Sequence, residues 1–242
     1  MNKDLLLYTH SDNGYGHFVI PFMYFALVTN PNYFVEVWAC DYDRHIKNVK
    51  RLNEIFGDRA LVVTTDTKRA DTSRFKFPPK TRKPYTYISD VDIITLDQHI
   101  VDWHIGNLDG KCFSNAIRKM EVNEKLPRLS GLMFVITDEW YDATNDSRLR
   151  DFGGSDEMIL AQIAFDTFPD TQAQFKFTEW ARPIHGIHMS PARKPYSSPG
   201  WEITSRWIHK LKTIEKHKTW PEFWSMTDDK WKQEYKRIEL EK

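Results

Sequence analysis

The first 65 residues alternate between short apolar segments and amphipathic segments, and this order constrains the fold more than any other feature. Short apolar or β-branched runs bounded by polar residues are typical of buried strands, and apolar residues near helical spacing indicate helices. The pattern predicts strands at 3–8, 33–41 and 59–65, and helices at 18–29 and 43–57. A strand–helix–strand–helix–strand order favours a sheet that is parallel in its first part. The sequence therefore predicts an α/β fold.

The rest of the chain continues this pattern and then changes in composition. We expect apolar strand segments at 84–96 and 128–137, a helix at 155–168, and a loop or short helix at 66–83. From Trp201 the chain is rich in Trp and Lys, has high helix propensity and is broken by Pro221. We expect a catalytic domain over residues 1–200, with two or three helices over 201–242 packed on it as an appendage.

Composition excludes several classes of protein. The 242-residue chain has 34 Lys and Arg against 34 Asp and Glu, so net charge gives no support for a nucleic-acid partner. Its two cysteines, Cys40 and Cys112, form no CxxC pair, which argues against a thiolate metal site or a disulfide framework. The N-terminal apolar run is too short for a signal peptide, and no segment approaches the ~20 apolar residues of a membrane span. We expect a cytoplasmic protein.

Two aspartates that end a strand form the sharpest local motif. Asp90 and Asp92 in "SDVDII" stand two residues apart, where ligands of open α/β sheets bind. Two carboxylates there suit a hard divalent cation, which would neutralise the charge that builds up on a departing diphosphate. A solvated strand end with two aspartates is the alternative, because the pattern is common.

Two further segments carry candidate residues. His188 in "HGIHMSPARKPY" could add an imidazole to the metal, and a mixed carboxylate–imidazole set favours Mn²⁺ over Mg²⁺. Lys194 could meet phosphate as a positive charge. In "DFGGSDE", Asp156 and Glu157 open a helix and could face a sugar or an acceptor hydroxyl. A structural histidine and ordinary helix capping are the competing interpretations.

Taken in the order in which they occur along the sequence, the motifs resemble those of GT-A glycosyltransferases, and most closely those of the retaining family 8 enzymes and their small viral or bacterial relatives. The resemblance spans roughly residues 4 to 196. It rests on "DNGY" after the first strand, an arginine near Arg74 in "TSRF", "YISDVD", "RLSGLMFVI", "SDE" at a helix start, and "HMSPARKPY". This chain has Gly14, Leu129 and Pro191 where the family has Asn, Asn and Gly.

The resemblance implies a nucleotide-sugar transferase with a Rossmann-like mixed sheet flanked by helices. It implies a UDP-sugar donor, a glycan or glycoconjugate acceptor, and Mn²⁺, or Mg²⁺ in its place, held by Asp90, Asp92 and His188. Asp156 would lie near the transferred sugar. The remaining donor-binding residues implied by the resemblance are Thr9, Asp12, Tyr15, Arg74, Ser130, Gly131 and Lys194.

The sequence leaves several alternatives open. The family resemblance favours retention, but "GGSDE" also suits an inverting enzyme with Asp156 as general base, and a non-catalytic nucleotide-sugar binding module is a third possibility. The glycine-rich loop at 11–21 is also similar to the first loop of GT-B enzymes, although the chain is too short for two full Rossmann-like domains. The Trp/Lys-rich end could pack on the sheet domain, bind an acceptor glycan, or make peripheral contact with a membrane.

Overall fold

A single mixed sheet organises the chain, as seen in a computed structural model that describes residues 3–66, 69–108, 110–118, 128–145, 155–170, 184–189 and 201–240. Its strands follow the order β3-β2-β1-β4-β7-β6. The first four pair in parallel, whereas β7 runs antiparallel to both β4 and β6. Their bounds are β1 Leu5–Ser11, β2 Tyr33–Ala39, β3 Ala60–Thr64, β4 Tyr85–Ile88, β6 Phe113–Arg118 and β7 Arg128–Ile136.

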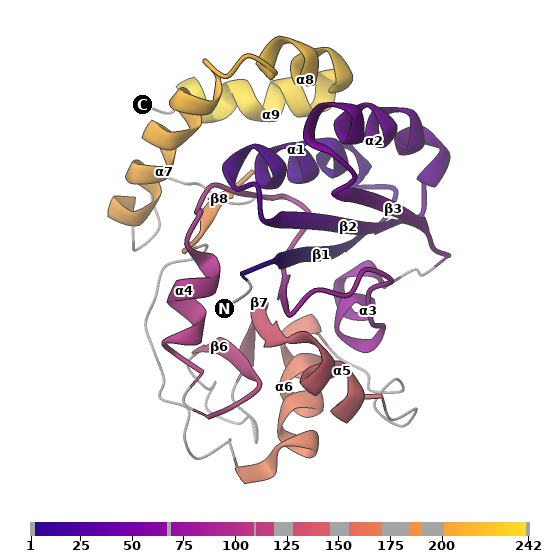
Figure 1. The fold of residues 1–242 in the computed structure, drawn as a ribbon, viewed down its shortest axis with the longest axis vertical. Helices are drawn as coiled ribbons and strands as arrows, with labels where there is room; N and C mark the ends of the chain where they lie inside the picture. The colour runs from indigo at the N-terminus through magenta and orange to yellow at the C-terminus, as the bar shows by residue number, and fades with distance from the viewer. Residues whose placement is uncertain are drawn as a thin grey trace.

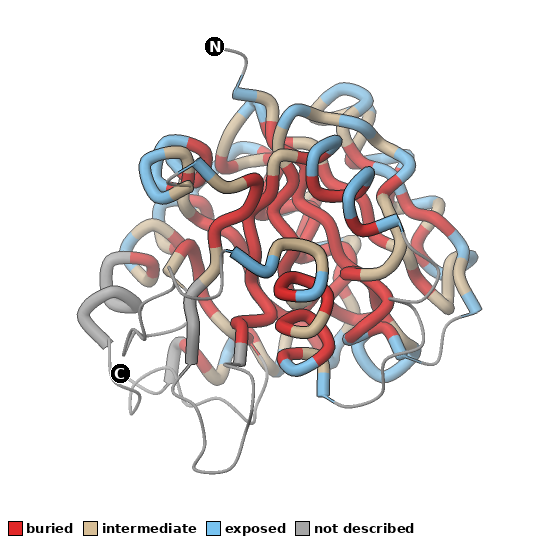
Figure 2. Tube along the Cα trace, turned by 90° about the horizontal axis from the view of Figure 1, so that it is seen from below, coloured by how far each residue is buried: buried red, intermediate tan, exposed pale blue. Residues whose placement is uncertain are grey.

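Helices cover both faces of this sheet (Figure 1). A 3₁₀ turn η1 (Gly16–Phe18), α1 (Val19–Thr29) and α2 (Tyr42–Phe56) lie on one side, with α3 (Ala70–Lys76), α5 (Thr137–Ala143) and α6 (Asp156–Thr167) on the other. The period-2 alternation of β1 explains the two layers: Leu5 and Leu7 join one apolar cluster, Leu6 and Tyr8 the other. Figure 2 shows the strands buried between these layers.

The α/β prediction is confirmed, and the early strands and helices lie where the alternating pattern places them. The short elements α4 (Ile100–Ile105), β6 and α5 were not foreseen, and neither were η1 and the strand at Gly186–His188, because such short elements carry little periodicity. The expected segment 84–96 divides, because residues 90–92 turn away from the sheet after β4. The chain then forms β5 (Ile93–Thr95), which pairs antiparallel with β8 (Gly186–His188) in a separate two-stranded sheet.

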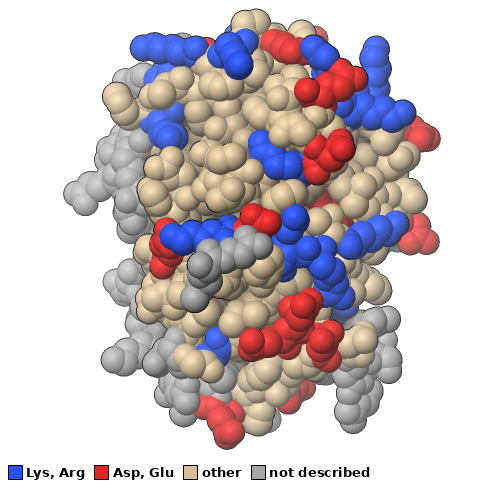
Figure 3. All heavy atoms as spheres, in the orientation of Figure 1, with Lys and Arg blue, Asp and Glu red and all other residues tan. Residues whose placement is uncertain are grey.

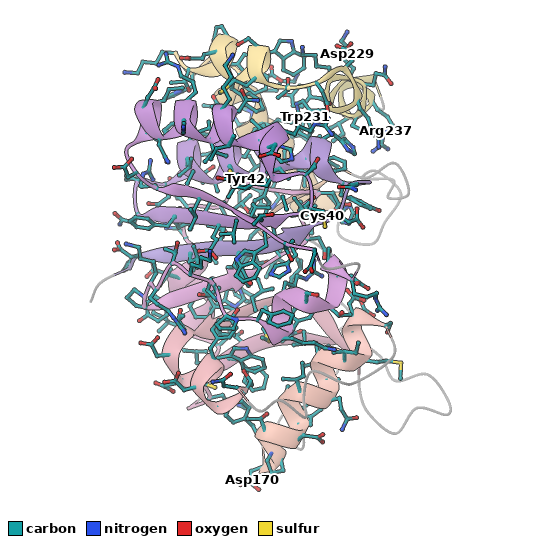
Figure 4. The ribbon with its side chains drawn as sticks, turned by 90° about the vertical axis from the view of Figure 1, so that its right-hand side faces the viewer. Cys40, Tyr42, Asp170, Asp229, Trp231 and Arg237 are labelled. Carbon is teal, nitrogen blue, oxygen red and sulfur yellow. The ribbon has the colours of Figure 1, made fainter. Side chains whose placement is uncertain are left out.

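The C-terminal segment folds into α7 (Trp201–Ile214), α8 (Trp220–Met226) and α9 (Asp229–Leu240), and α8 and α9 lie above α1 (Figure 1). Its apolar residues belong to the same buried cluster as α1. Phe223 stacks on Tyr24 with ring centroids 3.9 Å apart, and Trp231 is fully buried. Figure 4 labels Trp231 on α9. Trp207 and Trp231 are both buried in this cluster.

The surface of the described residues adds two observations. No helix among them is long and apolar enough to cross a membrane. On the face seen in Figure 3, Lys and Arg are interspersed with Asp and Glu, so this face presents no extended basic area. Both observations agree with the balanced composition.

We predict that Phe223→Ala destabilises the whole protein, because the C-terminal helices share its main core. The loss of a fully buried phenyl ring should lower the free energy of unfolding by about 3–5 kcal/mol. Urea denaturation measures this, with Leu61→Ala, whose side chain is 38% exposed, as the control. A change as small as the control's would mean that α8 is dispensable to the core.

Candidate functional site

The candidate site lies where the strand order reverses. β1 has β2, the next strand in the chain, on one side and β4 on the other, and ligands of open α/β sheets bind at the carboxyl ends of strands beside such a point. A cavity of about 290 Å³ opens there. Its lining comes from β1 and its following loop, α3, the turn after β4, α6 and β8: His10, Ser11, Asp12, Tyr15, Ala70, Asp71, Arg74, Asp90, Val91, Asp92, Asp156 and His188.

Three potential metal ligands converge in this cavity. One ligand atom from each of Asp90, Asp92 and His188 lies within 4.8 Å of the other two. His188 Nδ1 lies 3.6 Å from Asp92 Oδ2. The pairing of β5 with β8 places His188 opposite Ile93, the residue after Asp92, and the Met189 amide donates to the Asp92 carbonyl. Two carboxylates and one imidazole form a donor set that suits Mn²⁺.

Arg74 joins the metal group to the start of α6. It is 4% exposed, its guanidinium forms an ion pair with Asp90, and Nη2 lies 3.4 Å from Asp156 Oδ2. Its Nη1 donates to the Ser89 carbonyl. A Cβ on Gly131 would lie 3.0 Å from Arg74 Nη2 and 3.2 Å from Asp156 Oδ2, so glycine at this position leaves room for the network. One buried cation thus holds two carboxylates from distant segments.

The loop after β1 uses its own amides. Asp12 Oδ1 accepts hydrogen bonds from the backbone N–H groups of Gly14 and Tyr15, at 2.8 and 3.2 Å. Both N–H groups therefore donate to the Asp12 side chain of the same loop, so in this conformation they are not directed at a bound phosphate. Tyr15 is 43% exposed at the cavity rim, which leaves its ring accessible to a ligand.

His10 is a buried imidazole that lines the cavity, and no sequence motif marks it. Its ring stacks on Trp38 with centroids 5.1 Å apart, and Nε2 lies 2.6 Å from the Tyr8 hydroxyl. Tyr8 donates its single proton to the Phe77 carbonyl, so His10 Nε2 must be the donor in this pair. Burial, with a smaller contribution from Arg74, lowers the pKa of His10 to about 3, and the ring is therefore neutral.

The structure brings most of the predicted site residues together. Asp12, Tyr15, Arg74, Asp90, Asp92, Asp156 and His188 all line the cavity. Gly131 lies beside it, next to Arg74 and Asp156. Lys194 lies outside the described residues, so its place near a diphosphate stays a prediction.

Besides Gly131, three described residues that the sequence predicted are not among those lining the cavity. Thr9 is fully buried, and its hydroxyl donates to the His10 carbonyl. The Ser130 hydroxyl accepts from the Leu132 amide. Glu157, 7% exposed, follows Asp156 into the first turn of α6. Conversely, Asp71 and His10 line the cavity without a motif to mark them; the only available signal was their nearness to Arg74 and to the end of β1.

Comparison with solved structures identifies the fold. The galactosyltransferase LgtC, solved in complex with donor and acceptor sugar analogs, superposes with a TM-score of 0.53 at 10% identity, over 95% of this chain and 99% of LgtC. The glycosyltransferase GlyE of Streptococcus pneumoniae TIGR4 superposes with a TM-score of 0.52 at 12% identity, over 98% of this chain and 63% of GlyE. The apo form of GlyE superposes with a TM-score of 0.51 at 14% identity, over 74% of this chain and 46% of the GlyE chain.

These comparisons show that the chain has a GT-A fold, as the sequence motifs predicted. The chain spans about half to two thirds of the length of the GlyE chains it matches. The sequence matches no protein-family model and no curated protein.

We predict that His10 makes folding pH-dependent. Because its folded-state pKa of about 3 lies below its ordinary value, the unfolded chain binds the proton first as pH falls. The contribution of neutral His10 to the free energy of unfolding is fully present above pH 6.5 and is lost between pH 6.5 and 3. This loss amounts to about 2 kcal/mol by pH 5. His10→Phe should flatten this part of the pH profile of unfolding free energy, whereas His209→Phe, at an exposed position, should not. Parallel profiles for His10→Phe and wild type would contradict the prediction.

Proposed function

We propose that this protein is a metal-dependent glycosyltransferase that moves a sugar from a nucleoside-diphosphate sugar, specifically a UDP-sugar, to a glycan or glycoconjugate acceptor with retention. The convergence of Asp90, Asp92 and His188 at the switch point of a GT-A sheet carries this proposal. The turn with Asp90 and Asp92 and the strand with His188 are far apart in the sequence, and their convergence in a cavity favours a ligand-binding role.

The charge of the cavity supports a bound cation. Five aspartates line it, Asp12, Asp71, Asp90, Asp92 and Asp156, whereas Arg74 is the only Lys or Arg among the described lining residues. A diphosphate would meet net repulsion there. Asp90, Asp92 and His188 would hold Mn²⁺, with Mg²⁺ as the alternative ion; when bound, the ion neutralises the charge of the diphosphate leaving group.

The chain's own residues then have distinct roles in the proposed transfer. Tyr15 and Asp12 hold the nucleoside at the end of β1, and Lys194 meets the diphosphate. Asp156, held by Arg74, faces the transferred sugar and stabilises positive charge at its anomeric carbon. With retention, the acceptor oxygen bonds to the anomeric carbon as the bond to phosphate breaks, and the departing phosphate takes the acceptor's proton on the same face.

Two alternatives make different use of the same residues. In an inverting enzyme Asp156 would take the proton of the acceptor hydroxyl from the opposite face, as a general base. In a non-catalytic module the cavity would bind the nucleotide sugar without turnover. The linkage of the product, read by proton NMR at its anomeric centre, separates retention from inversion.

The cellular setting belongs to the proposal as well. We expect action in the cytoplasm, and the acceptor could reside on a membrane. Lys232 and Lys236, which share one face of α9, are basic residues that would meet an anionic surface in a peripheral contact.

We predict that Asp92→Asn removes metal-dependent donor binding. Wild type should show a rise in melting temperature with a UDP-sugar plus Mn²⁺, because a ligand that binds only the folded state stabilises it by about 2.7 kcal/mol at 100 times its Kd. Asp92→Asn should lose this rise. Asp71→Asn, which removes a cavity carboxylate outside the metal group, should retain it. The absence of a wild-type response to any UDP- or GDP-sugar would count against the proposed function.

We predict that Asp156→Asn slows transfer while donor binding persists. The loss of the carboxylate that faces the sugar should reduce kcat by about 100-fold or more, as is typical when one electrostatic group of the transition state is removed. Steady-state kinetics with the donor identified by thermal shift measure kcat and KM separately. A rise in KM with unchanged kcat would instead assign Asp156 to ground-state binding.

A further inference from the structure

Three buried polar side chains and the partly buried Asp97 form a continuous hydrogen-bond network outside the cavity. His185 Nδ1 lies 2.8 Å from Asp97 Oδ2, and His185 Nε2 lies 3.0 Å from His104 Nε2. His104 Nδ1 in turn lies 3.0 Å from Ser114 Oγ. Ser114 and both imidazoles are between 3% and 6% exposed. These four side chains have no role in the proposed sugar transfer. Burying several polar groups costs free energy unless each one has a hydrogen-bond partner.

Hydrogen bonds satisfy every ring nitrogen in this network. Asp97 can only accept as a carboxylate, so His185 donates from Nδ1. Burial, with a contribution from the neighbouring His185, holds the pKa of His104 well below its usual range, so His104 is neutral. Between the two rings one Nε2 donates and the other accepts, and His104 Nδ1 pairs with the Ser114 hydroxyl. Because each ring nitrogen has a partner, the network is a rigid connection.

This hydrogen-bond network joins the small β5–β8 sheet, beside which the proposed metal ligands lie, to the main sheet. His185 immediately precedes β8, Asp97 follows β5, and Ser114 belongs to β6. The His185 carbonyl also accepts from the amides of Leu96 and Asp97, at 2.9 and 3.2 Å. His104 stacks flat on Phe134 of β7, with centroids 4.8 Å apart. The network thus fixes one end of the β5–β8 pair against β6 and β7.

The other end of that pair carries Asp92 and His188. β8 has three residues, so His188 lies about 10 Å along an extended strand from His185. The two strands approach closely, because a Cβ on Gly186 would lie 1.9 Å from the Ile94 carbonyl oxygen. On the far side of His188, Arg237 of α9 donates to the Met189 carbonyl at 3.0 Å. A displacement at His185 would therefore reach His188 through a short, tightly packed strand.

We propose that His185 is a positioning residue for the metal site: through Asp97 and His104 it holds β8 so that His188 stays in register with Asp90 and Asp92. This inference rests on the proposed function, since it assumes that these three residues bind a divalent ion. It assigns a role to a buried histidine–carboxylate pair that makes no contact with the ion.

The test measures Mn²⁺ itself. Titration of the full chain with Mn²⁺, followed by electron paramagnetic resonance, gives the Kd, and pulsed measurements detect the nitrogen of a coordinated imidazole. His185→Ala should weaken Mn²⁺ binding by about 10-fold, the lower end of the effect of removing a residue that orients ligands, and should reduce the nitrogen signal. His185→Asn, whose amide can still donate to Asp97, should recover part of both.

His45→Ala is the matched control. His45 is 2% exposed and lies 2.8 Å from Asp41, so it is as buried and as closely paired as His185, but it belongs to α2. Both alanine variants should lower the melting temperature, and only His185→Ala should change the Mn²⁺ affinity and the nitrogen signal. His188→Ala should abolish the nitrogen signal and identifies its source.

The outcomes separate the two proposals. If wild type binds Mn²⁺ with an imidazole nitrogen and His185→Ala binds it equally well, the positioning role is wrong and the metal site stands. If wild type binds no Mn²⁺, both the metal-dependent function and the positioning role are wrong. If His185→Ala does not fold, the comparison of His185→Asn with wild type decides: an unchanged Kd and nitrogen signal would overturn the role, and an intermediate loss of both would support it.

Discussion

The parallel pairing of β1 with β4 is the contact on which the candidate site depends. It aligns Leu5 with Tyr85 through Tyr8 with Ile88, and the Ser89 amide extends it by donating to the Tyr8 carbonyl. Because both strands end at the same edge, the loop with Asp12 and the turn with Asp90 emerge side by side. The helices that carry Arg74 and Asp156 pack on one face of this pair, and the small β5–β8 sheet follows directly from the turn after β4.

Electrostatics set the second constraint. Carboxylates that crowd one cavity repel each other unless cations separate them, and Arg74 supplies one positive charge from a buried position between Asp90 and Asp156. The close approach of its guanidinium to Gly131 explains why β7 has no side chain there. Under the proposed function, a bound divalent ion would add to this compensation and offset the repulsion of a diphosphate.

The C-terminal helices pack in the core, and α9 also contacts segments that line the candidate site. Lys230 donates to the Gly14 carbonyl in the loop after β1, and Arg237 donates to the Met189 carbonyl beside His188. α9 therefore contacts two of the segments that line the cavity. Two of the C-terminal tryptophans, Trp207 and Trp231, are buried in the main core.

Features that depend on local pattern could be predicted from the sequence alone. Alternating apolar periods placed the early strands and helices, the "SDVD" motif placed two carboxylates at a strand end, and the order of weak motifs indicated the GT-A fold that the structural comparisons show. Which distant groups meet depends instead on how the chain packs in three dimensions. His188 lies near Asp92 because a strand of three residues pairs with β5. Arg74 bridges Asp90 and Asp156. His10 and Asp71 line the cavity although no sequence motif marks them. The physical reason is that strand order and the packing of short elements arise from contacts between segments far apart in the chain, which no local periodicity encodes.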